Sequence, residues 1–249
     1  MDGLEEAIRS GIKIRRDQVN FIRYADDFIV TARTKETLEQ IVKTAVIAFQ
    51  AARGLALSEQ KTTITHIEAG FSFLGQNVRK YKNKLLIKPA KDGGKALVQK
   101  TRETLKGTLG QTAATLIRRL NPMLRGWANY HRHVCSGKTF GTLDRIVHHQ
   151  VLRWARRTHP DKSYGWLKRK YYNSGGGFGF SARIRTRTGE SRVRRLYSIA
   201  KTVIERHIKV RGEANPYDPE HTEYFERRRC FAWRTLPCGK AGQVLAAGV

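Results

Sequence analysis

The spacing of the apolar residues changes partway along the chain, and this change limits the possible folds more than any other feature. Up to about residue 90, short runs of β-branched and aromatic residues are separated by turn-forming residues, a pattern typical of β-strands. After "KDGG", apolar residues recur at intervals of three and four, a pattern typical of amphipathic helices. Strands followed by helices predict an α+β fold, in which an antiparallel sheet with a packed helix precedes a helical bundle.

The most distinctive segment of the first part is "FIRYADDFIV", residues 21–30. Strand-like stretches at 19–25 and 28–32 predict a hairpin with Asp26 and Asp27 as its two-residue turn. Asp tolerates turn geometry, so a purely structural role is one explanation of the pair. Metal binding is the other, because adjacent carboxylates repel one another unless a cation neutralises them. Mg²⁺ is held by one or two carboxylates together with substrate phosphates.

The rest of residues 1–92 extends the predicted sheet and adds one helix to it. The helix is expected to begin after Thr34, its N-cap, and to end at Gly54, with apolar residues at helical spacing between them. The segments "GLALSEQKTTITHI" and "GFSFLGQNV" predict further strands. The segment "KLLIKP" predicts a short basic strand that ends at Pro89.

Residues 93–160 are predicted to form a bundle of three or four helices. The first helix is expected over roughly residues 94–107. A second is expected to end near Asn121, which would cap the next helix with Pro122 in its first turn. The last helix of the bundle is expected to stop before Pro160, because proline cannot continue a helix.

Two further segments follow the bundle. Residues 161–211 are rich in Lys and Arg, and Arg183, Arg185 and Arg187 alternate along a stretch that predicts a strand with all three on one face. Residues 212–249 show little pattern and are expected to form a disordered tail.

The charge balance indicates a polyanionic partner. The 249 residues include 48 Lys and Arg against 21 Asp and Glu, a net charge of +27, which favours nucleic acid. A membrane partner is not expected, because no apolar stretch is long enough to span a bilayer and no signal peptide is recognisable. Cys135, Cys230 and Cys238 lack metal-binding spacing, so we expect a reducing, cytoplasmic location with neither disulfides nor a zinc site.

Five blocks of the sequence together resemble one known family. In chain order they are "FIRYADDFIV", "RGLALSEQKTTITHI", "GFSFLGQNVRKY", "LLIKPA" and "LNPMLRGWANYHRH". Their order and spacing resemble the group II intron-encoded reverse transcriptase/maturase family. The resemblance implies the end of a polymerase palm in residues 1–92 and a helical thumb or maturase domain in 93–160. It also implies a DNA-binding region in 161–211.

The resemblance also implies catalytic roles. Asp26 and Asp27 match the metal-binding pair of a two-Mg²⁺ site, and Tyr24 and Ala25 match the turn beneath the incoming deoxynucleotide and the primer end. Lys61, in "SEQKT", matches a lysine near the triphosphate, where it would stabilise charge or protonate the leaving pyrophosphate. A solvated lysine after a strand is the alternative for this residue.

Other matching residues concern the primer and the RNA. The segment "GFSFLG" resembles the part of the family that contacts the primer strand, and it contains Phe71, Phe73, Leu74 and Gly75. The two phenylalanines are also typical of a core. Trp127 is expected in the core of the helical domain rather than as a platform for bases. The residues expected to contact nucleic acid are all cationic: Arg118, Arg119, Arg125, Lys168, Arg169, Lys170, Arg183, Arg185 and Arg187.

The sequence departs from the family at both ends. A two-metal site needs a third carboxylate from an earlier palm strand, and only 25 residues precede Asp26. We therefore expect that the chain cannot polymerise alone. Two explanations stay open: the chain acts with an N-terminal reverse transcriptase fragment as a split enzyme, or it is a degraded copy. After residue 212, Cys230 and Cys238 do not form the paired motif of an HNH nuclease, so no nuclease activity is expected.

Two functions remain open at this stage. The first is RNA-directed DNA polymerisation, with structured intron RNA, a DNA target or primer, and dNTPs as partners. The second is a maturase role, in which the chain binds intron RNA and assists splicing without polymerase activity. A retron-type reverse transcriptase is a third interpretation, and the "RGWANYHRH" block and the long basic segment argue against it.

Overall fold

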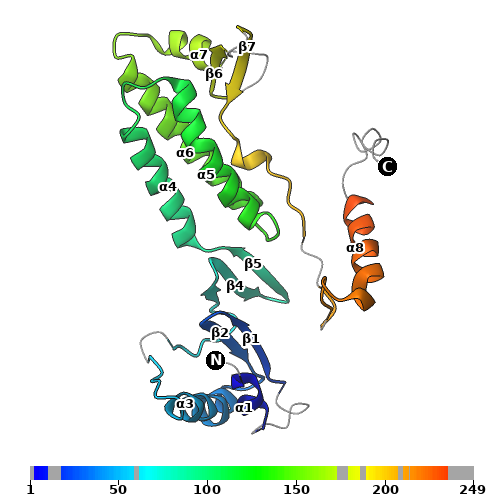
Figure 1. The fold of residues 1–249 in the computed structure, drawn as a ribbon. Coiled ribbons are helices and arrows are strands. Elements are labelled where there is room, and N and C mark those ends of the chain that lie inside the picture. The colour runs from blue at the N-terminus through cyan, green and yellow to red at the C-terminus, as the bar shows by residue number, and fades with distance from the viewer. Residues whose placement is uncertain are drawn as a thin grey trace.

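A computed structural model describes residues 3–10, 18–58, 62–172, 179–185, 189–206, 210–212 and 214–234 (Figure 1). It combines helices with antiparallel strands, which confirms the predicted α+β class. The helical elements are α1 (Leu4–Ser10), the π-helix η1 (Thr37–Val42), α3 (Lys43–Ala51), α4 (Lys91–Lys106), α5 (Ala113–His131), α6 (Gly137–Thr158), α7 (Tyr164–Tyr172), η2 (Ile199–Lys201), η3 (Pro219–His221) and α8 (Thr222–Arg234). The strands are β1 (Asn20–Tyr24), β2 (Asp27–Thr31), β3 (Phe71–Phe73), β4 (Gln76–Tyr81), β5 (Lys84–Pro89), β6 (Ser181–Arg185) and β7 (Ser191–Arg195).

Strands β1 and β2 form the predicted hairpin, but the turn lies one residue earlier than predicted. Tyr24 pairs with Asp27, so Ala25 and Asp26 make the turn and Asp27 is the first residue of β2. Ala25 adopts a left-handed backbone with a φ of 52°, which is uncommon for a residue with a side chain.

Apolar pairing across the hairpin explains this register. Phe21 pairs with Val30, and the ring centroids of Phe21 and Phe28 lie 5.9 Å apart. The predicted turn would have placed Phe21 opposite Ala32 and lost this pair. Cross-strand pairs of aromatic and β-branched residues stabilise a register, so they offset the unfavourable backbone at Ala25.

The helix after the hairpin begins and ends as predicted. The hydroxyl of Thr34 accepts a hydrogen bond from the Thr37 N–H at 3.3 Å, which confirms its role as N-cap. The first turns form the π-helix η1 before α3 continues. Gly54 has a φ of 69°, and the N–H of Leu55 donates to the carbonyl of Gln50 at 2.9 Å, an ending that requires the left-handed conformation.

A small core joins these elements. The buried side chains come from α1, η1 and α3, and one face of the hairpin packs against them. The buried residues are Leu4, Ile8, Val42 and Val46, and the partly buried ones include Phe21, Phe28, Val30 and Phe49.

Strands β3, β4 and β5 form a second antiparallel sheet, separate from the hairpin within the described residues. Val78 pairs with Phe71 on one side and Ile87 on the other, and β5 ends at Pro89 as predicted. The segment "GLALSEQKTTITHI" was also expected to form a strand, and for its described residues, 54–58 and 62–67, that prediction is wrong. The side chains of residues 62–66 are all exposed, so no apolar face fixes a strand register.

The helices α4 to α7 share one continuous core. Three of them, α4 to α6, lie where the bundle was predicted, whereas α7 lies beyond the predicted end of the bundle at residue 160. The wrong prediction here is a break at Pro122, which lies inside α5. Leu120 and Leu124 are fully buried on either side of it and hold the helix in the core. Because proline has no N–H, the helix carbonyl four residues before Pro122 lacks its usual donor. Pro122 is exposed, so water can hydrogen-bond to that carbonyl.

Asn121 has a different role from the predicted cap. Its side-chain amide donates to the carbonyl of Arg195 at 2.9 Å and accepts from the N–H of Tyr197 at 2.8 Å. These bonds fix the end of β7 against α5. The helices α4 to α7 and their shared core, which we call the helical body, therefore include the β6–β7 hairpin, as Figure 1 also shows.

The last described part of the chain contains η3 and α8, which the sequence pattern did not predict. The N–H of Arg211 donates to the Tyr224 hydroxyl at 2.9 Å, and the Asp218 side chain caps η3. No helix in the described segments is both long enough and apolar enough to cross a membrane.

Candidate active site and nucleic-acid interface

The two adjacent aspartates lie at the end of the β1–β2 hairpin. Asp26 is in the turn, Asp27 opens β2, and both are exposed. Among the described residues, neither carboxylate forms an ion pair, so both have oxygen atoms open to a cation. In this part of the chain, no group of three or more His, Cys, Asp or Glu side chains comes together as a metal site.

The neighbours of the aspartates are divided between two faces of the hairpin. Phe21, Phe28 and Val30 face the core, whereas Tyr24 lies on the opposite face with Ile22. Tyr24 is 63% exposed and Ile22 is 54% exposed. The expected nucleotide-facing residue Tyr24 is therefore open to solvent beside the carboxylates.

Two of the predicted site residues cannot be placed. Lys61 and Arg187 lie outside the described residues. The expected contact between Lys61 and a triphosphate, and the expected third arginine of the strand, stay predictions.

The residues expected to contact a primer form β3 and the turn that follows it. Phe71 and Phe73 are half-buried, and Leu74 and Gly75 make a two-residue turn with φ values of 47° and 71°. Gly75 is suited to this position because of its positive φ. A Cβ there would meet only the Tyr130 ring, at 3.7 Å, so close packing does not exclude a side chain.

This turn is fixed by Tyr130 of α5 and by Ala90, the residue before α4. The Tyr130 hydroxyl donates to the carbonyl of Leu74 at 2.6 Å, and the N–H of Ala90 donates to the carbonyl of Gly75 at 2.9 Å. Sequence reasoning missed Tyr130, although it lies in the "RGWANYHRH" block. The β3–β4 turn is thus held at a fixed place against the end of α5.

A buried histidine reinforces the same contact. His131 is 3% exposed, its ring centroid lies 4.3 Å from that of Trp127, and its Nδ1 lies 3.4 Å from Oε1 of Gln76. Burial, and to a lesser degree the charge of His133, lowers the pKa of His131 to about 4. The imidazole is therefore neutral at pH 7. Trp127 also lies 5.8 Å from Phe140, which agrees with the predicted core position.

The predicted nucleic-acid contacts fall into separate groups. Arg118 and Arg119 are exposed on α5, and the Arg125 guanidinium lies 5.3 Å from the Tyr197 ring. The others are on α7 and β6, where all the described ones are exposed: Lys168, Arg169, Lys170, Arg183 and Arg185. Arg183 and Arg185 share one face of β6, as predicted.

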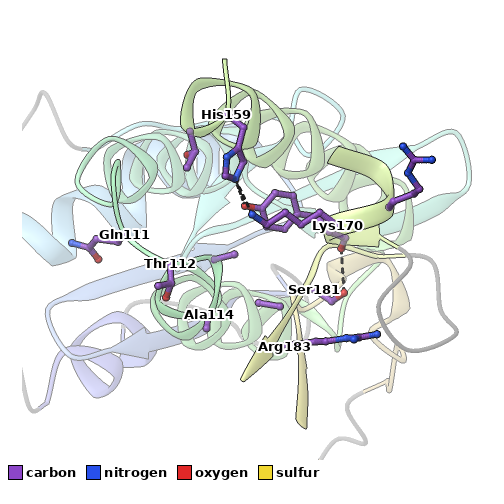
Figure 2. Close-up of a pocket in the computed structure, with 12 residues that line it drawn as sticks. Gln111, Thr112, Ala114, His159, Lys170, Ser181 and Arg183 are labelled. Carbon is purple, nitrogen blue, oxygen red and sulfur yellow. Dashed lines mark hydrogen bonds between the residues drawn. The ribbon is translucent and has the colours of Figure 1, made fainter. Parts of the chain in front are cut away.

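Three of these cations come together at one cavity. Arg169, Lys170 and Arg183 line a cavity of about 580 Å³ between α5, α6, α7 and β6 (Figure 2). His159 and Thr112 line it too, and sequence reasoning assigned neither of them to a site. Their positions depend on contacts between segments distant in the sequence, which no local pattern indicates.

Two protein-family models match the chain. Residues 1–78 match the reverse transcriptase (RNA-dependent DNA polymerase) model, and residues 94–172 match the model of the group II intron, maturase-specific domain. A search among curated proteins finds no match. The hairpin and the helical body thus define a polymerase-type segment joined to a maturase-type domain. The chain belongs to the group II intron reverse transcriptase/maturase family, whose enzymatic activity is RNA-directed DNA polymerisation.

Proposed function

We propose that Asp26 and Asp27 bind Mg²⁺ for the polymerase reaction of this family. The observation that carries the proposal is the hairpin itself, which holds two exposed carboxylates side by side on a backbone fixed by Phe21 and Val30. Mg²⁺ takes one or two protein carboxylates and completes its shell with water and phosphate oxygens, so these residues fit the ion. When bound, such ions stabilise the attacking and leaving oxygens of phosphoryl transfer.

The neighbouring residues have positioning roles in this proposal. Tyr24 and Ala25 contact the incoming dNTP and the primer end, and Lys61 contacts the triphosphate. The β3 residues Phe71 and Phe73, with the turn at Leu74 and Gly75, contact the DNA primer strand. Support for the primer role comes from the fixed position of that turn against Tyr130.

Metal binding tests this proposal directly. Titration with Mn²⁺, followed by the loss of the free-ion electron paramagnetic resonance signal, should show saturable binding that Mg²⁺ displaces. Asp26→Asn and Asp27→Asn should each weaken it by about tenfold, because each removes a charged ligand. Asp92→Asn, an exposed aspartate of α4, is the matched control and should leave it unchanged. Equal affinity in all four proteins would refute the site.

Activity gives the second readout. Primer extension on an RNA template with dNTPs and Mg²⁺ should require Asp26 and Asp27 and should tolerate Asp92→Asn. The assay is run with the chain alone and with an N-terminal reverse transcriptase fragment added. Extension that survives both Asp26→Asn and Asp27→Asn would contradict the proposed catalytic role.

A second candidate function is maturase-type RNA binding that assists intron splicing without polymerisation. The exposed cations on α5, α7 and β6 favour it, because they need no metal site to neutralise phosphates. Splicing assistance that persists in the Asp26→Ala, Asp27→Ala double variant would favour this function.

A cytoplasmic location also stays a proposal, supported by the low cysteine content.

The RNA-binding part has its own test. Affinity for a structured intron RNA should fall steeply with salt, and replacing Arg118 and Arg119 by Gln should reduce the log–log salt slope by about 2. Arg102, exposed on α4, is the control position for the same substitution. An equal change in slope per arginine removed would assign binding to net charge rather than to α5.

A further inference from the structure

The cavity beside the start of α5 is a concave part of the basic surface that the structure describes. Its walls come from the loop before α5, the end of α6, helix α7 and strand β6 (Figure 2). Its volume of about 580 Å³ lies within the range of small-molecule sites. Because the walls come from several elements, the cavity can contact a single group from more than one side.

The helix that opens onto the cavity presents free amide donors. The Thr112 hydroxyl accepts from the N–H of Thr115 at 3.3 Å, and the carbonyl of Thr112 accepts from the N–H of Leu116 at 3.1 Å. The N–H groups of Ala113 and Ala114 precede these bonds, so they have no acceptor within the helix. Both alanines line the cavity. An anion there would meet two amide donors and the positive end of a 19-residue helix.

Charged side chains add to this field from two other elements. Arg169 and Lys170 come from α7, and Arg183 comes from β6. No Asp or Glu is among the described residues that line the cavity. Arginine and lysine together with helix amides are the groups that proteins use to bind phosphate.

His159 contacts two other residues that line the cavity. Its Nε2 lies 2.7 Å from the Tyr171 hydroxyl and 3.4 Å from Nζ of Lys170. An ammonium group can only donate, so Nε2 is the acceptor and the ring proton is assigned to Nδ1. Burial, followed by the charges of Lys170 and Lys162, lowers the pKa of this histidine, which keeps the ring neutral at pH 7.

We propose that this cavity binds the phosphate of a nucleotide unit, with Lys170, Arg183 and the first amides of α5 as its ligands. The inference rests on the proposed RNA-binding function and deepens it, because it assigns one phosphate of the bound strand to a concave site. The phosphate belongs either to a strand terminus or to the backbone, and the chemistry of the site is the same for both.

AMP is the probe, and adenosine is its uncharged counterpart. Isothermal titration calorimetry on the full chain should show saturable binding of AMP and none of adenosine. Lys170→Gln and Arg183→Gln should each weaken AMP binding by about tenfold, because each removes one charge-assisted contact. Lys138→Gln on α6 and Arg192→Gln on β7 remove the same charge from exposed positions outside the cavity, and they should leave AMP binding unchanged.

A variant at Ala114 separates loss of binding from loss of folding. Ala114→Glu places a carboxylate in the first turn of α5, where it stabilises the helix but repels a phosphate. Ala114→Gln introduces a neutral side chain of the same size. Loss of AMP binding in the Glu variant well beyond that in the Gln variant, with unchanged circular dichroism, is the expected result. Equal losses in the two variants would show that the added charge has no effect, and would overturn the conclusion that the cavity binds an anion.

RNA oligonucleotides identify the source of the phosphate. If AMP displaces a 5′-phosphorylated RNA more effectively than its 5′-hydroxyl form, the site binds the phosphate of a strand terminus. If AMP displaces both RNAs equally, the site binds a backbone phosphate. Absence of saturable AMP binding, or equal weakening by Lys138→Gln, overturns the cavity as a phosphate site. If RNA still binds in that case, the proposed RNA-binding function is not refuted. If AMP binds but RNA does not, the RNA-binding function is refuted and the cavity remains a phosphate site.

Discussion

The region around the aspartate hairpin and the helical body bury their apolar residues to very different extents. In residues 3–58 the hairpin has one face against a small core and leaves Ile22 and Tyr24 more than half exposed on the other. In the helical body, residues of all four helices from α4 to α7 share one core, and Leu116, Leu120 and Val151 are completely buried. Burial of apolar surface is the main source of stability, so the helical body should be the more stable region.

This difference has a functional meaning. The metal-binding residues that we propose lie on the region with the smaller core, whereas the proposed RNA-binding residues lie on the region with the larger one. Between them, the β3–β5 sheet hydrogen-bonds to the end of α5. Mutations, pH changes and lost hydrogen bonds should therefore destabilise the two regions to different extents.

The largest effect is expected from a cavity in the larger core. Leu120→Ala removes a side chain with no exposed surface and should lower the free energy of unfolding of the helical body by about 2–5 kcal/mol. Hydrogen exchange read by mass spectrometry should show faster exchange in α4 to α6 and little change in β1 and β2. Leu109→Ala, at a side chain that is 47% exposed, is the control and should change little. Equal loss of protection in the hairpin would mean that the two regions unfold as one unit.

Acidification should destabilise the helical body through His131. The folded pKa is about 4 against an ordinary value of 6.5, so between these values the unfolded state binds a proton that the folded state does not. The free energy of unfolding should therefore fall as the pH drops from about 6.5 to about 4, by on the order of 3 kcal/mol.

Thermal unfolding followed across this pH range measures the effect. His131→Gln should flatten the pH dependence whatever it does to stability at pH 7, and His149→Gln, at an exposed position of α6, should not. If the free energy of unfolding of the wild-type protein does not change down to pH 5, then the pKa of His131 is not lowered in the folded protein.

A smaller effect is expected where the β3–β5 sheet meets α5. Tyr130→Phe removes the hydroxyl that donates to the carbonyl of Leu74 and should cost about 1 kcal/mol. Exchange of the amides around Leu74 and Gly75 should accelerate, while the core amides of α5 keep their protection. Tyr81→Phe, at an exposed tyrosine of the same sheet, is the control. No change at the turn would show that Ala90 alone holds it.

The parts of the fold that depend on local chemistry could be predicted from the sequence. The cap at Thr34, the ending at Gly54, the strand over Lys84–Pro89 and the bundle of amphipathic helices all follow from neighbouring residues. The aspartate pair was recognisable for the same reason, since a short motif contains both residues.

The errors come from contacts between distant segments. Pro122 remains inside α5 because buried leucines on both sides hold the helix, and Asn121 bonds to residues more than 70 positions away. The hairpin turn moved by one residue because Phe21 packs better opposite Val30 than opposite Ala32. The phosphate cavity combines residues of four elements, so no single stretch of sequence indicates it.

The smallest effect is expected on the outer face of the hairpin, and it tests the comparison most sharply. Ile22 is 54% exposed, so Ile22→Thr keeps a β-branched residue in the strand and removes little buried apolar surface. The free energy of unfolding should change by less than about 0.5 kcal/mol. Val46→Thr, at a side chain that is 3% exposed in the same region, places a hydroxyl in the core and should cost clearly more. Chemical denaturation of the two variants measures both effects. If Ile22→Thr destabilises the chain as much as Val46→Thr, then this face of the hairpin is covered in solution. The apolar residues around the aspartates would in that case be buried as well as those of the helical body.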